Sequence, residues 1–291
     1  MRPDWKETRY NDKKINLSNN VCYDHILLND VSKIIKNTEF NLRQYPDEVI
    51  VYKSISNYHK IPLENIAIGY GLGELINRIL NLKQIKKLSI ISPTWTMVEV
   101  FCKLQNIEHS TEYDLTANSI YIANPNGMTG QCLSRSEIID IIKKFEIVII
   151  DEAYGEFAEI EFSVLALAVK YENLIVLKTF SKTLGLAGLR LGYAISNEKI
   201  IYDLQLYRPS CVMNGVLISI IDQLYEMIPS HIKRMKKTKN YIETHYNCIK
   251  SHGNYVLIKD DVSVFENKFI IKTLPNGIHR MALTNLDLIL K

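Results

Sequence analysis

Lys182 is the residue of this chain whose setting most strongly suggests covalent chemistry. It lies in the glycine-rich stretch 179–193, directly after the apolar run 174–177, so we expect it just past the end of a buried strand. A lysine held in a partly desolvated pocket can lose its proton near neutral pH and form an imine with a carbonyl compound. A solvated lysine on a surface turn is the alternative, because short motifs also occur by chance.

Three further groups of polar or aromatic residues each follow an apolar run directly. In an α/β sheet with crossover helices, the carboxyl ends of parallel strands meet at one edge, and ligands bind there. We therefore expect these groups to converge around Lys182. They are residues 92–95, which include Trp95, residues 124–130, and residues 151–154, which include Asp151 and Tyr154.

Three glycines at alternate positions separate a short apolar run from an amphipathic helical pattern. They are Gly69, Gly71 and Gly73. Backbone N–H groups in such a loop, together with the helix dipole, can hold a phosphate group. A tight turn without a ligand is the alternative. The stretch is not the G-x-G-x-x-G of a dinucleotide fold, because the third glycine is missing.

A lysine, a phosphate-holding loop, an aspartate, a tyrosine and an indole in one place describe a site for pyridoxal phosphate. An aspartate that leaves the sheet on an apolar strand needs a cationic partner, and a protonated pyridine nitrogen supplies one. The cofactor is an electron sink held as a lysine imine, with an acidic residue at its ring nitrogen. Lys182 and Asp151 would fill these two roles.

The elements that position these residues predict an α/β protein with a second, smaller domain. Short apolar runs separated by helical patterns indicate a mostly parallel sheet with flanking helices. We expect an N-terminal arm over residues 1–25, the large α/β domain over 26–205 and a small α+β domain over 206–291.

Individual elements follow from the spacing of apolar residues and from capping residues. Strands are predicted at the apolar runs 66–68, 88–91, 119–123, 147–150 and 174–177 and around 253–258 and 278–283, the latter followed by a short helix. Residues 200–250 have a helical pattern, interrupted by a loop at 208–210. Further helices are predicted over 26–35, 49–59, 97–104 and 164–169, and Ser134 or Ser136 is expected to cap a helix that runs to Lys144.

Several segments resemble the motifs of fold-type-I pyridoxal-phosphate aminotransferases, most closely those of the histidinol-phosphate aminotransferase branch. The most specific are DEAY at 151–154 and TFSKTLGLAGLRLGY at 179–193. The segments ANPNGMTG at 123–130, PTW at 93–95 and QYPD at 44–47 extend the likeness. It runs from about residue 40 to 210 and returns in the C-terminal part.

By this resemblance, four residues act on the cofactor ring. Lys182 binds pyridoxal phosphate covalently and moves a proton at the substrate α-carbon. Asp151 keeps the ring nitrogen protonated, Tyr154 donates to the ring oxygen, and Trp95 stacks on the ring face. A core tyrosine and a core tryptophan are the alternatives for the last two.

The same resemblance implies ligands for the cofactor's phosphate. Ser181 and Arg190 are the side-chain ligands, and the planar guanidinium of Arg190 suits a contact through several hydrogen bonds. Gly71, Leu72 and Gly73 are the backbone cradle.

Substrate and partner contacts are implied as well. Arg280 binds the substrate α-carboxylate as a bidentate pair, unless it is a surface arginine. Asn20 and Tyr23 lie in the N-terminal segment that corresponds to a substrate loop. Tyr45 resembles a tyrosine that reaches the phosphate of the neighbouring site across a dimer interface, which implies a homodimer.

One motif departs from the family pattern N-P-N-N-P-T-G. Gly127 and Met128 replace the second Asn-Pro pair. The asparagine that contacts the ring oxygen in the family aligns with Gly127. Either Asn126 or Asn124 substitutes for it, or the contact is absent.

Composition and charge exclude several classes of protein. The 291 residues are 47% hydrophobic and 23% charged, with a net charge of only +3, so nucleic acid is not indicated as a partner. The basic run 233–239 is expected to be a solvated helix face. Five scattered cysteines without a C-x-x-C pair predict reduced thiols and no metal site, and the polar N-terminus and the lack of a long apolar run predict a cytoplasmic protein without a membrane span.

These observations favour a pyridoxal-phosphate-dependent aminotransferase that exchanges an amino group between an L-amino acid and a 2-oxo acid or a phosphorylated carbonyl compound. A decarboxylase of an O-phospho amino acid, similar to threonine-phosphate decarboxylase, has nearly the same motifs. A homologue that binds the cofactor without catalysis is a third possibility. The motifs do not distinguish which bond at the α-carbon breaks.

Overall fold

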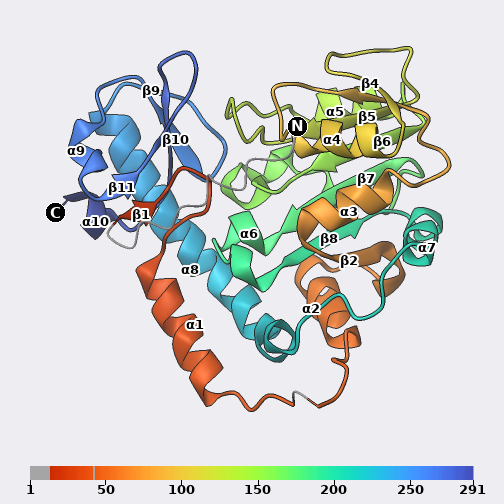
Figure 1. Cartoon of the computed structure of the whole chain (residues 1–291), viewed down its shortest axis with the longest axis horizontal. Coiled ribbons are helices and arrows are strands. Elements are labelled where there is room, and N and C mark those ends of the chain that lie inside the picture. The colour runs from red at the N-terminus through yellow and green to blue at the C-terminus, as the bar shows by residue number, and fades with distance from the viewer. Residues whose placement is uncertain (1–13, 42, 291) are drawn as a thin grey trace.

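The computed structural model describes residues 14–41 and 43–290, which are built around a twisted central sheet with helices on both faces (Figure 1). In this described part of the chain the sheet has seven strands, in the order β2-β8-β7-β6-β5-β3-β4. Only β8 runs antiparallel to its neighbours, so the predicted mostly parallel sheet is confirmed. The strands are β2 (Ile66–Tyr70), β3 (Lys87–Ile90), β4 (Glu108–Ser110), β5 (Ser119–Ala123), β6 (Ile147–Asp151), β7 (Leu174–Thr179) and β8 (Leu191–Ile195).

The central strands form where apolar, mostly β-branched residues follow one another. Every residue of β6 and β7 is buried, as expected for parallel strands covered on both faces. One face packs against α2 (Val49–His59), α5 (Arg135–Ile142) and the first half of α8 (Gly215–His245). The other face packs against α3 (Gly71–Ile79), α4 (Met97–Leu104) and α7 (Glu198–Leu206).

Most of the predicted elements of the large domain are confirmed. Helices α2 and α4 have the expected bounds, and α1 (His25–Asn37) extends slightly beyond the expected 26–35. Ser134, not Ser136, caps α5 through a capping box with Glu137. The sequence pattern missed β4 and β8, because β4 is a polar three-residue strand and β8 begins directly after a glycine-rich stretch.

The helix predicted over 164–169 was wrong. The chain forms only a 3₁₀ turn there, Leu165–Leu167. This crossover folds around the buried carboxylate of Glu152, which accepts hydrogen bonds from Ser163 Oγ and from the backbone N–H of Val164. Further 3₁₀ turns lie before it, at Gly155–Phe157 and Ile160–Phe162.

A second, antiparallel sheet lies in the C-terminal part of the chain. Its strand order is β12-β13-β10-β9. The N-terminal segment joins this part, because β1 (Ile15–Asn16) pairs with β11 (Phe269–Ile270). The remaining elements are β9 (Cys248–Ile249), β10 (Tyr255–Ile258), α9 (Ser263–Glu266), β12 (Lys272–Thr273), β13 (His279–Ala282) and α10 (Leu286–Leu290).

Helix α8 connects the two parts. Its residues from Leu217 to Ile228 pack in the core of the large sheet, whereas Met235 and Ile242 pack with Leu17 in the C-terminal core. Helix α8 therefore contributes side chains to both hydrophobic cores. The predicted division of the chain into two domains between residues 205 and 206 stays a prediction.

The basic run on α8 is not simply a solvated face. Lys233 and Lys237 are exposed, as expected, but Arg234 binds Asp24 and Lys239 is buried. The Lys239 ammonium donates to the backbone carbonyls of Ser251 and Gly253. This part of the prediction was wrong because the helical periodicity turns two of these cations inward, where backbone and carboxylate oxygens receive them.

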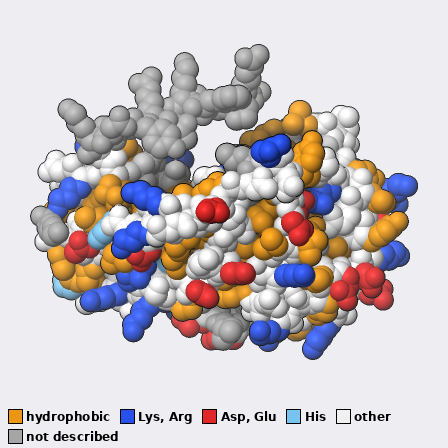
Figure 2. Space-filling view, turned by 90° about the horizontal axis from the view of Figure 1, so that it is seen from below, with side chains coloured by type: hydrophobic (Ala, Val, Ile, Leu, Met, Phe, Trp, Pro, Cys, Tyr) orange, Lys and Arg blue, Asp and Glu red, His pale blue; other side chains and the backbone are white. Residues whose placement is uncertain are grey.

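The molecular surface shows no concentration of one charge on the face drawn in Figure 2, where lysine, arginine and acidic side chains are interspersed with hydrophobic ones. All five cysteines are free thiols. Among the described residues, no helix combines the length and apolar character that a membrane crossing requires.

Candidate active site

A cavity of about 490 Å³ opens at the carboxyl edge of the central sheet. Segments that follow β2, β3, β5, β6 and β7 contribute to its wall, together with the N-terminal segment and the C-terminal sheet. Arg190 reaches the same edge because it precedes the antiparallel strand β8. Ten predicted site residues line the cavity: Asn20, Leu72, Gly73, Trp95, Asp151, Tyr154, Ser181, Lys182, Arg190 and Arg280.

Lys182 lies half-buried in this wall, on the short helix α6 (Phe180–Thr183) that directly follows β7. Thr179 caps α6 by accepting the N–H of Ser181. The Lys182 amine donates to the backbone carbonyl of Asn19 at 2.8 Å. Burial, and secondly the charge of Arg280, lower the pKa of Lys182 to about 8, against smaller opposing effects of Cys22 and Asp151. The amine is therefore close to losing its proton near neutral pH.

Asp151 ends β6, and both of its carboxylate oxygens are occupied. Oδ2 accepts a hydrogen bond from the hydroxyl of Tyr121 at 2.6 Å, and Oδ1 accepts the N–H of Ala153 at 2.9 Å. Burial raises the pKa of Asp151, whereas these two hydrogen bonds and the nearby Lys182 lower it. The sequence reasoning missed Tyr121, although a tyrosine in the apolar strand that precedes the 124–130 loop was a signal that could have found it.

Tyr154 and Gly127 both line the cavity and lie next to each other. Its hydroxyl accepts a hydrogen bond from the side-chain amide of Asn20 at 3.2 Å. Burial raises the pKa of Tyr154 to about 12, and the bond from Asn20 opposes this rise. A Cβ atom at Gly127 would lie only 2.7 Å from Cε2 of Tyr154. The tyrosine ring can occupy its position because glycine has no side chain there.

Gly71 and Arg190 meet at one end of the cavity. Gly71 has a φ of +76°, and a Cβ atom on it would lie 2.3 Å from Nη2 of Arg190. Only glycine suits this position, because both the backbone conformation and the guanidinium exclude a side chain. Arg190 stacks on the ring of Tyr70 at 5.1 Å and donates to the carbonyl of Ala187.

Trp95 also lines the cavity and is 45% exposed. It contacts Phe101 edge to face, with ring centroids 6.1 Å apart. A Cβ atom at Gly73 would lie 3.2 Å from the indole, so the glycine lets the ring lie close to the backbone.

Arg280 comes from β13 of the C-terminal sheet and is buried. Its Nη1 donates to the carbonyl of Gly127 and its Nη2 to the carbonyl of Ser18, both at 3.1 Å. A guanidinium has five N–H groups, so enough remain for a carboxylate. Lys272 of β12 is the cross-strand partner of Arg280 and lines the cavity as a second cation.

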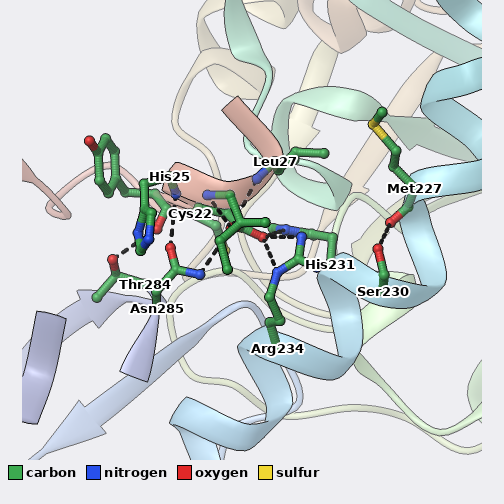
Figure 3. A network of polar contacts seen from close by, with 12 residues as sticks. Cys22, His25, Leu27, Met227, Ser230, His231, Arg234, Thr284 and Asn285 are labelled. Carbon is green, nitrogen blue, oxygen red and sulfur yellow. Dashed lines mark hydrogen bonds and ion pairs between the residues drawn. The ribbon is translucent and has the colours of Figure 1, made fainter. Parts of the chain in front are cut away.

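A buried polar network fixes the segment that carries Asn20. Asp24 caps α1 and accepts hydrogen bonds from Arg234 and from Asn285, and its Oδ2 lies 2.8 Å from Nδ1 of His231. Figure 3 shows how His231 and Arg234 of α8 and Asn285 reach the start of α1. The network ties the N-terminal segment to two C-terminal elements, so Asn20 has a defined position.

Four predicted site residues do not line the cavity. Gly71 contributes only through its contact with Arg190. Tyr45 is 88% exposed and lies away from the cavity. Tyr23 is held by backbone bonds to Leu283 and Thr284.

The fourth is Asn126, whose side chain is fully engaged by its own loop and by the loop after β3. It donates to the carbonyl of Pro93 and accepts the N–H groups of Met128 and Thr129. Asn124 is equally engaged, since both ends of its amide bind the backbone of Leu133. Neither asparagine is free to replace the missing one.

The cavity also contains residues that were not predicted as site residues, although several of them lie within the motifs. Besides Tyr121 and Lys272, these are Asn19, Thr94, Thr96, Ala123, Gly127, Met128, Ala153, Thr179 and Ala187.

The chain is similar to known proteins over most of its length. The family model "Aminotransferase class I and II" matches residues 12–260. A histidinol-phosphate aminotransferase of Pyrococcus furiosus is 31% identical, over 81% of this chain and 75% of that protein.

Solved structures share the fold. One is a histidinol-phosphate aminotransferase from Sinorhizobium meliloti in complex with pyridoxal-5'-phosphate, with a TM-score of 0.75, 18% identity, and coverage of 94% of this chain and 88% of that one. Another is the L-threonine-O-3-phosphate decarboxylase from Porphyromonas gingivalis, with a TM-score of 0.77, 18% identity, and coverage of 92% and 94%. With the family match over residues 12–260 and the sequence identity to the Pyrococcus relative, the chain belongs to the class I and II aminotransferases.

Proposed function

We propose that this chain is a pyridoxal-phosphate-dependent aminotransferase of the histidinol-phosphate aminotransferase type. It would exchange an amino group between an L-amino acid and a 2-oxo acid or a phosphorylated carbonyl compound. The observation that carries the proposal is the position of the Lys182 amine, which shares one cavity with Asp151, Tyr154, Arg190 and Arg280.

The residues of the cavity fit pyridoxal phosphate. Arg190 and Ser181 would hold the phosphate, next to the side-chain-free turn at Gly71. Asp151 would bind the ring nitrogen and Tyr154 the ring oxygen. Three buried polar atoms of residues that line the cavity, Oδ1 of Asn20, Oγ1 of Thr94 and Nε of Arg280, have no hydrogen-bond partner among the described residues, which supports a polar ligand.

Bound pyridoxal phosphate supplies an electron sink for the electrons released at the substrate α-carbon. The protein's part is to orient the substrate and to move the proton. Arg280 would hold the α-carboxylate through its remaining N–H groups, which fixes the α-carbon near Lys182. With a pKa of about 8, the Lys182 amine can accept a proton and return it.

Asp151 must be anionic to stabilise a protonated ring nitrogen. Burial alone opposes this state, and the hydrogen bonds from Tyr121 and from the N–H of Ala153 favour it.

The pair of cations on the C-terminal sheet supports a substrate with a second anionic group. Lys272 and Arg280 face each other across β12 and β13 and both line the cavity. A phosphorylated carbonyl compound carries such a group, and so does the O-phospho amino acid of the decarboxylase alternative. The cation pair therefore favours phosphorylated substrates and leaves the choice of reaction to experiment.

The test begins with the cofactor. Purified protein with pyridoxal phosphate should show visible absorbance that borohydride removes, and Lys182→Ala should lack this absorbance. Amino donors and phosphorylated amino acids are then added one at a time. Formation of pyridoxamine phosphate indicates transamination, and release of carbon dioxide indicates the decarboxylase. A protein that binds the cofactor but gives neither product is the non-catalytic homologue.

We also propose a homodimer of a cytoplasmic enzyme. Tyr45 is almost fully exposed, and Ile26, Leu28, Val49 and Ile50 are exposed apolar side chains on the neighbouring helices. An interface there would cover them and let Tyr45 reach the partner's cavity. Sedimentation at working concentration tests this proposal, and a fully active monomer would contradict it.

A further inference from the structure

The side chain of Asn20 connects the N-terminal segment to the cavity wall. Its Nδ2 donates to the carbonyl of Gly127 at 2.9 Å and to the hydroxyl of Tyr154 at 3.2 Å. Asn20 is 3% exposed, and its Oδ1 has no hydrogen-bond partner among the described residues. Buried amides normally have partners at both ends, so this side chain has a function beyond filling space.

Asn20 lies beside the position in the neighbouring loop where the asparagine of the family pattern is missing. Gly127 stands where the family pattern has an asparagine, and the side chains of Asn124 and Asn126 are engaged by other groups. A side chain at 127 would collide with the ring of Tyr154. The only described side-chain amide that reaches the Tyr154 hydroxyl is therefore that of Asn20.

We propose that Asn20 is a positioning residue that orients the Tyr154 hydroxyl, and that it compensates through this tyrosine for the asparagine missing at position 127. This inference rests on the proposed binding of pyridoxal phosphate. A phenol has one proton to donate and two lone pairs to accept with. Because Asn20 donates to the hydroxyl oxygen, the Tyr154 proton is directed away from the amide and is available to the cavity, where it would donate to the ring oxygen of the cofactor.

The electrostatic effect has a definite direction. An N–H donor stabilises negative charge on the phenol oxygen, so Asn20 makes Tyr154 a stronger donor. The lowering effect of Asn20 on the pKa of Tyr154 agrees with this direction. A stronger donor stabilises negative charge on the ring oxygen and thereby makes the lysine-bound cofactor easier to deprotonate.

The backbone around Asn20 is built to hold this orientation. Asn20 has a φ of +55°, a conformation that asparagine tolerates better than most residues. The side-chain amide of Asn254 donates to the carbonyl of Asn20 at 3.0 Å and to that of Lys182 at 3.3 Å. The buried side chain of Asn254 thus fixes the backbone of Asn20 relative to that of Lys182.

The test uses two substitutions that suit the left-handed backbone. Asn20→Gly removes the side chain, and Asn20→Asp keeps its shape but removes the donor. The probe is pyridoxal phosphate, and the measurement is the pH midpoint of the visible absorbance of the loaded protein. We expect both variants to raise this midpoint by up to about one unit, the size of one lost hydrogen bond between neutral groups. Asn106→Gly is the matched control, since Asn106 has a φ of +56° and is exposed.

A second measurement separates orientation from general loosening. In a Tyr154→Phe background, Asn20→Gly should leave the midpoint unchanged, because the hydroxyl that it orients is gone. Equal shifts with and without the hydroxyl would overturn the inference. So would a wild-type midpoint in both Asn20 variants.

Failure of the proposed function would look different. If the wild-type protein never acquires the visible absorbance, the cofactor proposal itself fails. Thermal unfolding of the cofactor-free variants shows whether they are folded before loading.

Discussion

The hydroxyl of Tyr121 donates a 2.6 Å hydrogen bond to Oδ2 of Asp151, and both side chains are buried. The two residues lie on the neighbouring strands β5 and β6, so the sheet itself sets their separation. This bond offsets part of the cost of burying a carboxylate at the end of β6. The hydrogen bond from Tyr121 therefore helps to keep Asp151 negatively charged and able to bind a cationic group in the cavity.

Replacing Tyr121 with Phe should weaken the binding of pyridoxal phosphate about tenfold or more, the size of a lost hydrogen bond to a charged group. Without the hydroxyl, burial raises the pKa of Asp151 further, and the carboxylate becomes a weaker partner for a protonated ring nitrogen. Equilibrium titration followed by visible absorbance measures the affinity. Tyr113→Phe is the control, because Tyr113 is an exposed tyrosine outside the cavity. An unchanged affinity in Tyr121→Phe would contradict this role.

Lys182→Met should stabilise the cofactor-free protein at pH 7, by about 2–4 °C in Tm for each kcal/mol gained. The pKa of Lys182 is about 8 in the folded chain and about 10.4 in an unfolded one. Between these values the unfolded state binds more protons, so the stability of the wild-type protein rises with pH. The penalty for the buried charge is complete below pH 8 and disappears toward pH 10.

The difference between Lys182→Met and wild type should therefore shrink as the pH rises from 8 to 10. Thermal unfolding across this range checks it. Lys233→Met, at an exposed lysine of α8, should show no such pH dependence. If the difference in Tm between Lys182→Met and wild type were the same at all pH values, the gain in stability would come from packing and not from removal of the charge.

Asp24→Asn should lower the free energy of unfolding by about 3 kcal/mol, because it leaves Arg234 facing a neutral side chain in a buried network. The amide oxygen can still cap α1, so the loss reports the charge. Urea unfolding measures it. Since the pKa of Asp24 is well below its usual range, the wild-type advantage should be complete above about pH 4 and decrease in more acidic solution. Asp30→Asn, which breaks only the exposed 3.5 Å pair with Lys33, should cost about 0.5 kcal/mol or less.

Gly127→Ala should destabilise the protein by about 1–3 kcal/mol, the usual cost of an added methyl in a packed site. The new Cβ would lie 2.7 Å from the Tyr154 ring and push it from the cavity wall. Chemical denaturation measures the loss. Gly215→Ala, where an added Cβ meets nothing within 4 Å, should be neutral or slightly stabilising. Equal stability of the Gly127 variant and wild type would show that the ring has room to move.

Lys272→Gln should raise KM for a phosphorylated substrate about tenfold and leave kcat nearly unchanged, as expected when a contact contributes equally to substrate and transition state. Its effect on an amino donor with a single carboxylate should be small. Steady-state kinetics with both kinds of substrate test the prediction. Lys259→Gln provides a control at an exposed lysine that does not line the cavity. Equal effects on both substrates would exclude a role in recognising the second anion.

The part of the fold that could be predicted from the sequence depends on local patterns. The apolar runs ending at Ile150 and Leu177 marked buried strands, and the convergence of their following residues came from the geometry of parallel sheets. The role of Lys272 could not be found this way, because its partner Arg280 is reached only through strand pairing. A tyrosine within an apolar strand marked Tyr121 as unusual, but only the pairing of β5 with β6 shows that it lies beside Asp151.

The position of Asn20 illustrates the same limit more strongly. Its contacts, Gly127 and Tyr154, lie more than a hundred positions away in the sequence. The family resemblance placed Asn20 in a substrate loop, and the structure directs its amide at the Gly127 carbonyl and the Tyr154 hydroxyl. The sequence analysis missed for a similar reason that Arg234 of α8 points toward the protein interior. Its partner Asp24 lies near the N-terminal end of the chain, far away in the sequence.

The pairing of β1 with β11 has a consequence for biosynthesis. Ile15 and Phe269 are partners, so the N-terminal segment receives its place only after almost the whole chain has left the ribosome. Until then the central sheet can form with Lys182 and Asp151 in place, but Asn20 and Arg280 are missing from the cavity. During synthesis the sheet can therefore present Lys182 and Asp151 before Asn20 and Arg280 close the cavity around them.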